Sequence, residues 1–160
     1  MLGDADFLRL FHLMGLVGWL GAASADIVLE VLLKKSSSPS GQRLLMRCHA
    51  LTDRFIEGPG LIVAGITGFL LLADRGYLRA DAVWPTWFKW KIAAGVAVLF
   101  TNACALIFVY KRYRASELVP EAQSPMTDPR VTPWIQRTMI TSVGVPLAVV
   151  ALVLAGLYGR

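Results

Sequence analysis

The stretch FLRLFHLMGLVGW, residues 7–19, decides the fold of this chain. Apart from Arg9 and His12 it is apolar, and largely apolar sequence continues to Leu33. A helix over residues 7–33, at about 1.5 Å per residue, is long enough to cross a hydrocarbon core of about 30 Å. The stretch therefore predicts a transmembrane helix with an ionisable side chain, His12, inside it. Such a group is costly in a membrane unless it has a partner or a function.

The composition of the whole chain also favours a membrane protein. Of its 160 residues, 56% are hydrophobic and 17% are charged, and the mean hydropathy is +0.57. This is too apolar for a soluble domain of this length. Further apolar runs predict spans at about residues 56–73, 88–110 and 135–157. We therefore expect one all-α domain, residues 1–160, that forms a four-transmembrane-helix bundle in the lipid bilayer.

The basic residues predict the orientation of this bundle. A net charge of +5 would suggest a nucleic-acid partner for a soluble protein, but these cations lie between apolar runs, where they set topology and contact anionic lipid. We therefore expect no nucleic-acid partner. The side with the first and third loops holds ten of the 16 Lys and Arg residues. The positive-inside rule then places these loops in the cytoplasm and both termini in the periplasm of a bacterial inner membrane.

The second helix is expected to begin after Gly41 as an amphipathic segment and to become a span near Gly58. Pro59 lies at this change of character. Because proline lacks a backbone N–H and clashes with the preceding turn, we expect the helix to bend there.

Four residues are candidates for holding a cofactor. His12, Gly15 and Trp19 share a face of the first helix, and Lys91 lies at the start of the third span. His12 is about five residues, or roughly 8 Å, inside the membrane, and Lys91 is about four residues inside from the same side, so the two can meet at one level.

Each candidate also has a plainer interpretation. His12 is either a metal ligand or proton donor, or a helix-contact residue held by a hydrogen bond. Lys91 is either a ligand or proton carrier, or a side chain that extends to the membrane surface. Gly15, with Gly18 and the pair Gly65 and Gly68, either lets helices approach closely or leaves a gap for a flat porphyrin.

The second histidine, His49, precedes the second span at the opposite membrane face. Joint ligation of one haem by His12 and His49 is therefore disfavoured, and we expect His49 to be solvated at the surface. A group of charged residues lies at the same face, where we expect structural ion pairs, with contact to a polar substrate or a quinone as the alternative. Its members are Asp26, Glu30, Arg47, Asp53, Arg54 and Glu57.

Three segments resemble HemJ-type protoporphyrinogen oxidases. The first, LRLFHLMGLVGWLG (residues 8–21), is similar to the opening helix of these proteins and of CopD-like copper-resistance domains, where a histidine precedes a tryptophan by seven residues. The second, RFIEGPGLIVAGITG (residues 54–68), contains a proline–glycine pair as the HemJ-type segment does. The third, WFKWK (residues 87–91), matches a tryptophan that precedes the required lysine by four residues.

The resemblance implies haem b, with His12 and Lys91 as the residues needed for activity and His12 as the iron ligand. It implies a membrane redox protein that handles a porphyrin, and a quinone is the electron acceptor that we expect. The final helix and the Thr67-Gly68 pair are similar to an uncharacterised family of predicted bacterial integral membrane proteins, which has no assigned reaction. The alternative is therefore a non-catalytic accessory or assembly subunit of a larger membrane complex or a homo-oligomer, and the sequence leaves open whether the chain is an enzyme.

Overall fold

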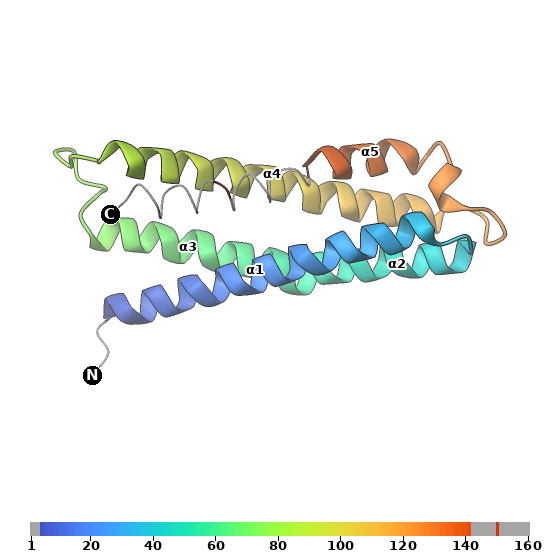
Figure 1. Cartoon of the computed structure of the whole chain (residues 1–160), viewed down its shortest axis with the longest axis horizontal. Helices are drawn as coiled ribbons and strands as arrows, with labels where there is room; N and C mark the ends of the chain where they lie inside the picture. Colours follow the sequence, from blue (N-terminus) through green and yellow to red (C-terminus); the bar gives the residue numbers. More distant parts are fainter. Residues whose placement is uncertain (1–3, 142–149, 151–160) are drawn as a thin grey trace.

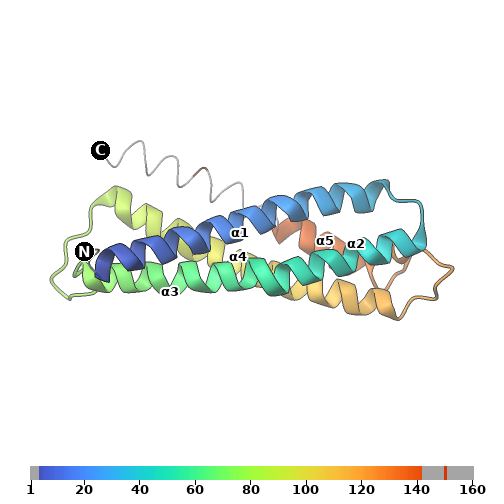
Figure 2. The ribbon, with the colours of Figure 1, turned by 90° about the horizontal axis from the view of Figure 1, so that it is seen from below.

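The computed structural model describes residues 4–141 and 150, and in these residues the chain is a helical bundle without strands (Figure 1). Three long helical rods run along the same axis, and each reverses the direction of the one before it (Figures 1 and 2). The elements are α1 (Asp4–Lys35), α2 (Pro39–Thr52), the π-helical turn η1 (Asp53–Glu57), α3 (Gly58–Asp74), α4 (Thr86–Glu117), the 3-10 turn η2 (Pro125–Thr127) and α5 (Thr132–Thr141). The first rod is α1, the second is the continuous segment α2–η1–α3, and the third is α4.

Within the described residues, three rods are long and apolar enough to cross a membrane: Ala5–Lys35, Pro39–Asp74 and Thr86–Glu117. Large apolar side chains on these rods face outward. Val17 is 71% exposed and Phe100 is 70% exposed, which suits a lipid environment and would be costly over so large a surface in water. The described helices are therefore compatible with a multi-pass protein of the lipid bilayer.

The fourth predicted span, residues 135–157, starts within α5, which ends at Thr141. Residues 142–149 and 151–157 of that span lie outside the described residues. The predicted all-α fold is thus confirmed in the described residues, three of the predicted spans are long apolar helices that could cross a membrane, and the fourth span stays a prediction.

The second rod begins earlier than the sequence predicted. Its first helix starts at Pro39 rather than after Gly41, because the Ser38 side chain accepts a hydrogen bond from the Gly41 backbone N–H at 3.3 Å and caps the helix. Proline is suited to the first turn, where its missing N–H leaves no intrahelical hydrogen bond unmade.

A π-helical turn, η1, joins α2 and α3 immediately before Pro59. The Gly58 backbone N–H donates to the Asp53 carbonyl, five residues back, instead of four. The structure thus has one wide turn just before Gly58 and Pro59, and the bend that the sequence predicted there stays a prediction. Asp53 and Glu57, the two ends of this turn, are both buried.

Helices α1 and α3 lie side by side (Figure 2) and touch through their backbones. A Cβ atom built on Gly15 would lie 2.7 Å from the Ala64 backbone nitrogen, and one built on Gly60 would lie 2.8 Å from the Trp19 backbone nitrogen. The predicted close approach of helices is thus confirmed at Gly15. Gly18, by contrast, has nothing within 4 Å of such an atom.

We expect Gly15→Ala to destabilise the protein by about 1–3 kcal/mol, because the added methyl group meets rigid backbone and the two helices must separate. The measurement is thermal unfolding in detergent, followed by circular dichroism. Gly21→Ala is the matched control, since a Cβ there has nothing within 4 Å, and it should be neutral or stabilise by up to about 1 kcal/mol through helix propensity. Equal unfolding temperatures for the two variants would show that α1 and α3 are not in backbone contact.

Two apolar clusters lie at different levels of the bundle. The first consists of Trp19, Leu61 and Val98, from α1, α3 and α4. The second lies toward the other end and consists of Leu33, Met46, Val119, Val131 and Ile135. Between Trp19 and Leu33 on α1, the side chains that face inward include Asp26 and Glu30, so a polar layer separates the two apolar clusters.

Candidate functional site

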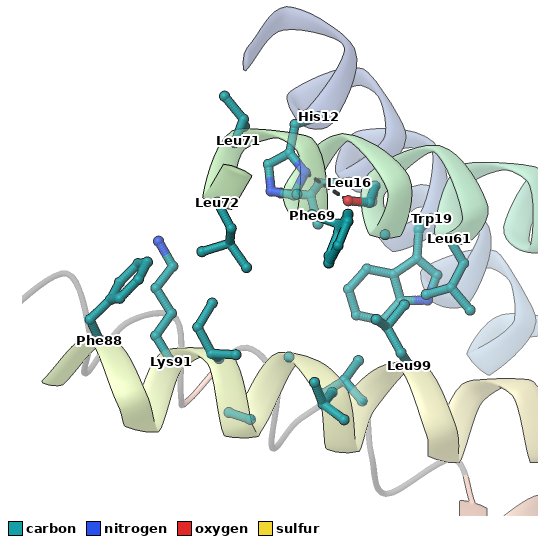
Figure 3. Close-up of a pocket in the computed structure, with 18 of the residues that line it drawn as sticks. His12, Leu16, Trp19, Leu61, Phe69, Leu71, Leu72, Phe88, Lys91 and Leu99 are labelled. Atoms are coloured by element: carbon teal, nitrogen blue, oxygen red, sulfur yellow. Dashed lines mark hydrogen bonds between the residues drawn. The ribbon is translucent and has the colours of Figure 1, made fainter. Parts of the chain in front are cut away.

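A cavity of about 450 Å³ opens between α1, α3 and α4 at the end of the bundle where α3 connects to α4 (Figure 3). Its walls are mostly apolar and include Leu16, Leu61 and Leu99. The size falls within the range of about 300–1,000 Å³ that small-molecule and cofactor sites occupy. The polar side chains on its walls are Arg9, His12, Arg75 and Lys91.

His12 lines this cavity from α1 and is held in one orientation by α3. Its Nδ1 lies 2.9 Å from the Ala64 carbonyl oxygen and 3.2 Å from the Thr67 Oγ1. A carbonyl oxygen can only accept, and the Thr67 hydroxyl donates its own proton to the Val63 carbonyl at 2.6 Å. Nδ1 is therefore a donor, and in the tautomer with its proton there the Nε2 lone pair is free of these hydrogen bonds.

Three cations line the cavity, and one of them, Arg9, also pairs with Asp6 at 3.2 Å. Lys91 extends from α4 toward the side where His12 lies (Figure 3), and Arg9 and Arg75 also line the walls. The structure thus brings His12 and Lys91 to one cavity, on opposite walls. Positive side chains on the walls of an apolar cavity suit an amphiphilic ligand that carries carboxylates or phosphates.

The two remaining sequence candidates, Trp19 and Gly15, have different positions. Trp19 is 2% exposed and lines the cavity, and its indole N–H has no hydrogen-bond partner among the described residues. Such a buried donor costs free energy unless an acceptor is supplied. Gly15 faces the α3 backbone, so the space beside it is taken up by helix packing.

A second group of polar side chains is enclosed farther along the bundle, and we call it the polar cluster. Its central contacts are made by Arg112, which is fully buried, donates to Glu30 and lies 2.8 Å from the His49 Nδ1. Asn102 donates to Glu57. The cluster consists of Asp26, Glu30, His49, Asp53, Glu57, Asn102 and Arg112.

The prediction that His49 is solvated at the surface was wrong. Its side chain is 7% exposed and lies 3.0 Å from the Glu30 carboxylate. The helix α2 is amphipathic, but the face that carries His49 packs against acidic residues of α1 rather than facing water. The predicted separation of the two histidines is confirmed, because Asp26, a neighbour of His49, lies 14 residues after His12 on α1, or about 21 Å away.

The charged partners within the polar cluster also differ from the prediction. Arg47 and Arg54 are exposed, and Arg54 lies over the ring of its neighbour Phe55 at 5.5 Å. Arg112 of α4 takes the role expected of them. The sequence contains a signal for this, since Asn102, Val109, Arg112 and Ser116 recur at intervals of three, four and seven residues and all are buried on one face of α4.

Comparisons with protein-family models, with curated proteins and with solved structures found no match to this chain. The resemblance to HemJ-type and CopD-like proteins therefore stays a prediction from the three sequence segments.

Proposed function

We propose that this chain is a membrane redox protein that binds haem b, or a related porphyrin, in the cavity between α1, α3 and α4. The observation that carries the proposal is the fixed orientation of His12, whose Nδ1 donates to the Ala64 carbonyl. Neutral imidazole is a common ligand of haem iron, and a hydrogen bond from the other ring nitrogen is the usual means of orienting it. His12 would then be the axial ligand, through Nε2.

The other cavity residues fit such a group. Apolar walls suit the porphyrin plane, and Arg9 and Arg75 suit its two carboxylates. The Trp19 indole ring closes one end of the cavity. Lys91 lines the opposite wall, and in this proposal it would be the second ligand or would carry a proton. The haem would supply one-electron transfer, while these residues bind and orient it.

The charge distribution and the resemblance supply the remaining parts of the proposal. Positive-inside orientation would place the cavity near the periplasmic face of a bacterial inner membrane. The resemblance to HemJ-type oxidases makes porphyrinogen oxidation the reaction class for an enzymatic role, with a quinone as the electron acceptor.

A cavity-filling substitution tests this proposal. Gly95 lines the cavity, and no described atom lies within 4 Å of a Cβ built on it, so Gly95→Leu should fill the space without disturbing the backbone. We expect at least a tenfold weaker haem affinity, measured by titrating haem b into the detergent-purified protein and following the Soret band. Gly21→Leu is the matched control, because this glycine is equally open but lies outside the cavity lining.

Unchanged affinity in Gly95→Leu would contradict binding in this cavity. A folded wild-type protein that is colourless and takes up no haem would contradict the redox function altogether. Co-purification of that colourless protein with a larger membrane complex would support the alternative, a non-catalytic accessory subunit.

A further inference from the structure

We propose that Asp26, His49 and Asp53 form a binding site for a divalent first-row transition ion, for which Zn²⁺ is the best fit. This site belongs to the polar cluster and is separate from the cavity that contains His12. One imidazole and two carboxylates form a donor set that Zn²⁺, Fe²⁺ and Mn²⁺ accept in proteins.

The spacing of the ligand atoms suits a metal ion. The candidate atoms of the three residues all lie within 4.8 Å of one another. The His49 Nε2 is 3.8 Å from the Asp26 Oδ1 and 3.6 Å from the Asp53 Oδ1. In a tetrahedral zinc site with bonds of about 2.0–2.2 Å, neighbouring ligand atoms are roughly 3.3–3.6 Å apart. The two distances from the His49 Nε2 are therefore within a few tenths of an ångström of those in such a site.

Asp26 provides an independent observation that points to a ligand. Its side chain is 9% exposed, and in the described part of the chain no N–H or hydroxyl group donates to its two oxygens, which lie beside the carboxyl groups of Asp53 and Glu57. A buried carboxylate without donors is costly. Because Asp26 faces the His49 Nε2, a cation bound between them would satisfy it.

The charge balance of the polar cluster leads to the same inference. Four carboxyl groups, those of Asp26, Glu30, Asp53 and Glu57, are enclosed with one guanidinium, that of Arg112, and one imidazole, that of His49. Uncompensated negative charge within a membrane protein is unfavourable. A divalent ion would offset most of the excess.

The contacts of the His49 Nδ1 allow the imidazole to act as a metal ligand. Nδ1 lies 3.0 Å from the Glu30 Oε1, an acceptor, and 2.8 Å from an Arg112 nitrogen, a donor. The ring can therefore carry its proton on either nitrogen. Metal binding requires the proton on Nδ1, so that His49 donates to Glu30, the Arg112 nitrogen gives up its hydrogen bond to Nδ1, and the Nε2 lone pair is directed toward Asp26 and Asp53, as in carboxylate–histidine–metal arrangements.

The test is a titration of the full-length protein, stripped with a chelator in mild detergent, with Co²⁺ as a spectroscopic substitute for Zn²⁺. We expect one Co²⁺ per chain, with visible absorption bands of a four-coordinate site, and displacement by Zn²⁺. Asp26→Asn, which preserves side-chain shape, should weaken binding by at least about 100-fold, since it removes a ligand rather than an outer-shell partner. His12→Ala should bind Co²⁺ as the wild type does.

Three results would overturn the inference. The first is a folded wild-type protein that binds no Co²⁺, in which case the cluster serves ion pairing or proton storage without a metal. The second is unchanged affinity in Asp26→Asn, and the third is loss of Co²⁺ in His12→Ala. Because haem binding is read at the Soret band and Co²⁺ binding at its own bands, failure of one proposal is distinguishable from failure of the other.

Discussion

Replacing His12 with alanine is expected to abolish the Soret band of the haem-loaded protein and to weaken haem binding by at least about 100-fold, as loss of a metal ligand does. The physical reason is that His12 is the cavity residue with a neutral nitrogen lone pair held in a fixed direction, by the hydrogen bond from its Nδ1 to the Ala64 carbonyl. The measurement is an optical titration with haem b in detergent.

The control for this prediction is the other histidine. His49→Gln removes an imidazole that lies in the polar cluster and not in the cavity lining, so it should leave haem affinity within about twofold of the wild type, well under 1 kcal/mol. A Soret band that survives in His12→Ala and disappears in His49→Gln would contradict the assignment of the ligand.

Replacing Arg112 with methionine is expected to destabilise the protein by about 3–5 kcal/mol, the usual effect of breaking a buried ion pair by removing one partner. Arg112 has no exposed surface and donates to Glu30. Its loss would leave buried carboxylates without a cation beside them, although methionine fills a similar volume. The measurement is the free energy of unfolding in detergent, followed by circular dichroism.

Arg114→Met is the matched control on the same helix. Its side chain is 64% exposed and pairs with Glu117 at 3.0 Å, and exposed ion pairs contribute about 0–1 kcal/mol. Similar unfolding free energies for the Arg112 and Arg114 variants would show that the polar cluster does not depend on its guanidinium.

The sequence was sufficient to predict the membrane-spanning helices that the structure describes, because each depends on a local property, a long apolar run. The close approach at Gly15 was also predictable, since a small side chain on a helix face has a direct steric meaning. From the sequence, only a bend near Pro59 could be expected, because proline removes a backbone donor. The π-helical turn η1 could not be predicted, since proline does not determine which N–H groups the neighbouring carbonyls accept from.

The surroundings of His49 and Arg112 were not predicted, for two different reasons. The polar face of α2 looks like a water-facing surface in isolation, and only the acidic residues of α1, which complement it, make it an interior face. Arg112 belongs to the basic run KRYR, which is typical of a membrane boundary, but α4 continues to Glu117, so Arg112 lies in the interior of the bundle. Both depend on how three helices pack, which single-helix patterns do not contain.

The cavity was beyond prediction from sequence for a related reason. His12, Leu61 and Lys91 come from three helices, and the space between them depends on how far α4 lies from the pair α1 and α3 at one end of the bundle (Figure 3). The similar depth of His12 and Lys91 in the membrane could be estimated from the rise per residue of each helix. The structure has both residues on the walls of this cavity.

The central claim is that the cavity holds one haem through His12. The most direct measurement is the reduced-minus-oxidised optical spectrum of the wild-type protein purified with added haem b, together with the haem content per chain. The predicted result is a Soret band, a b-type α band on reduction and one haem per chain. A folded protein that remains colourless after haem is added would contradict the claim.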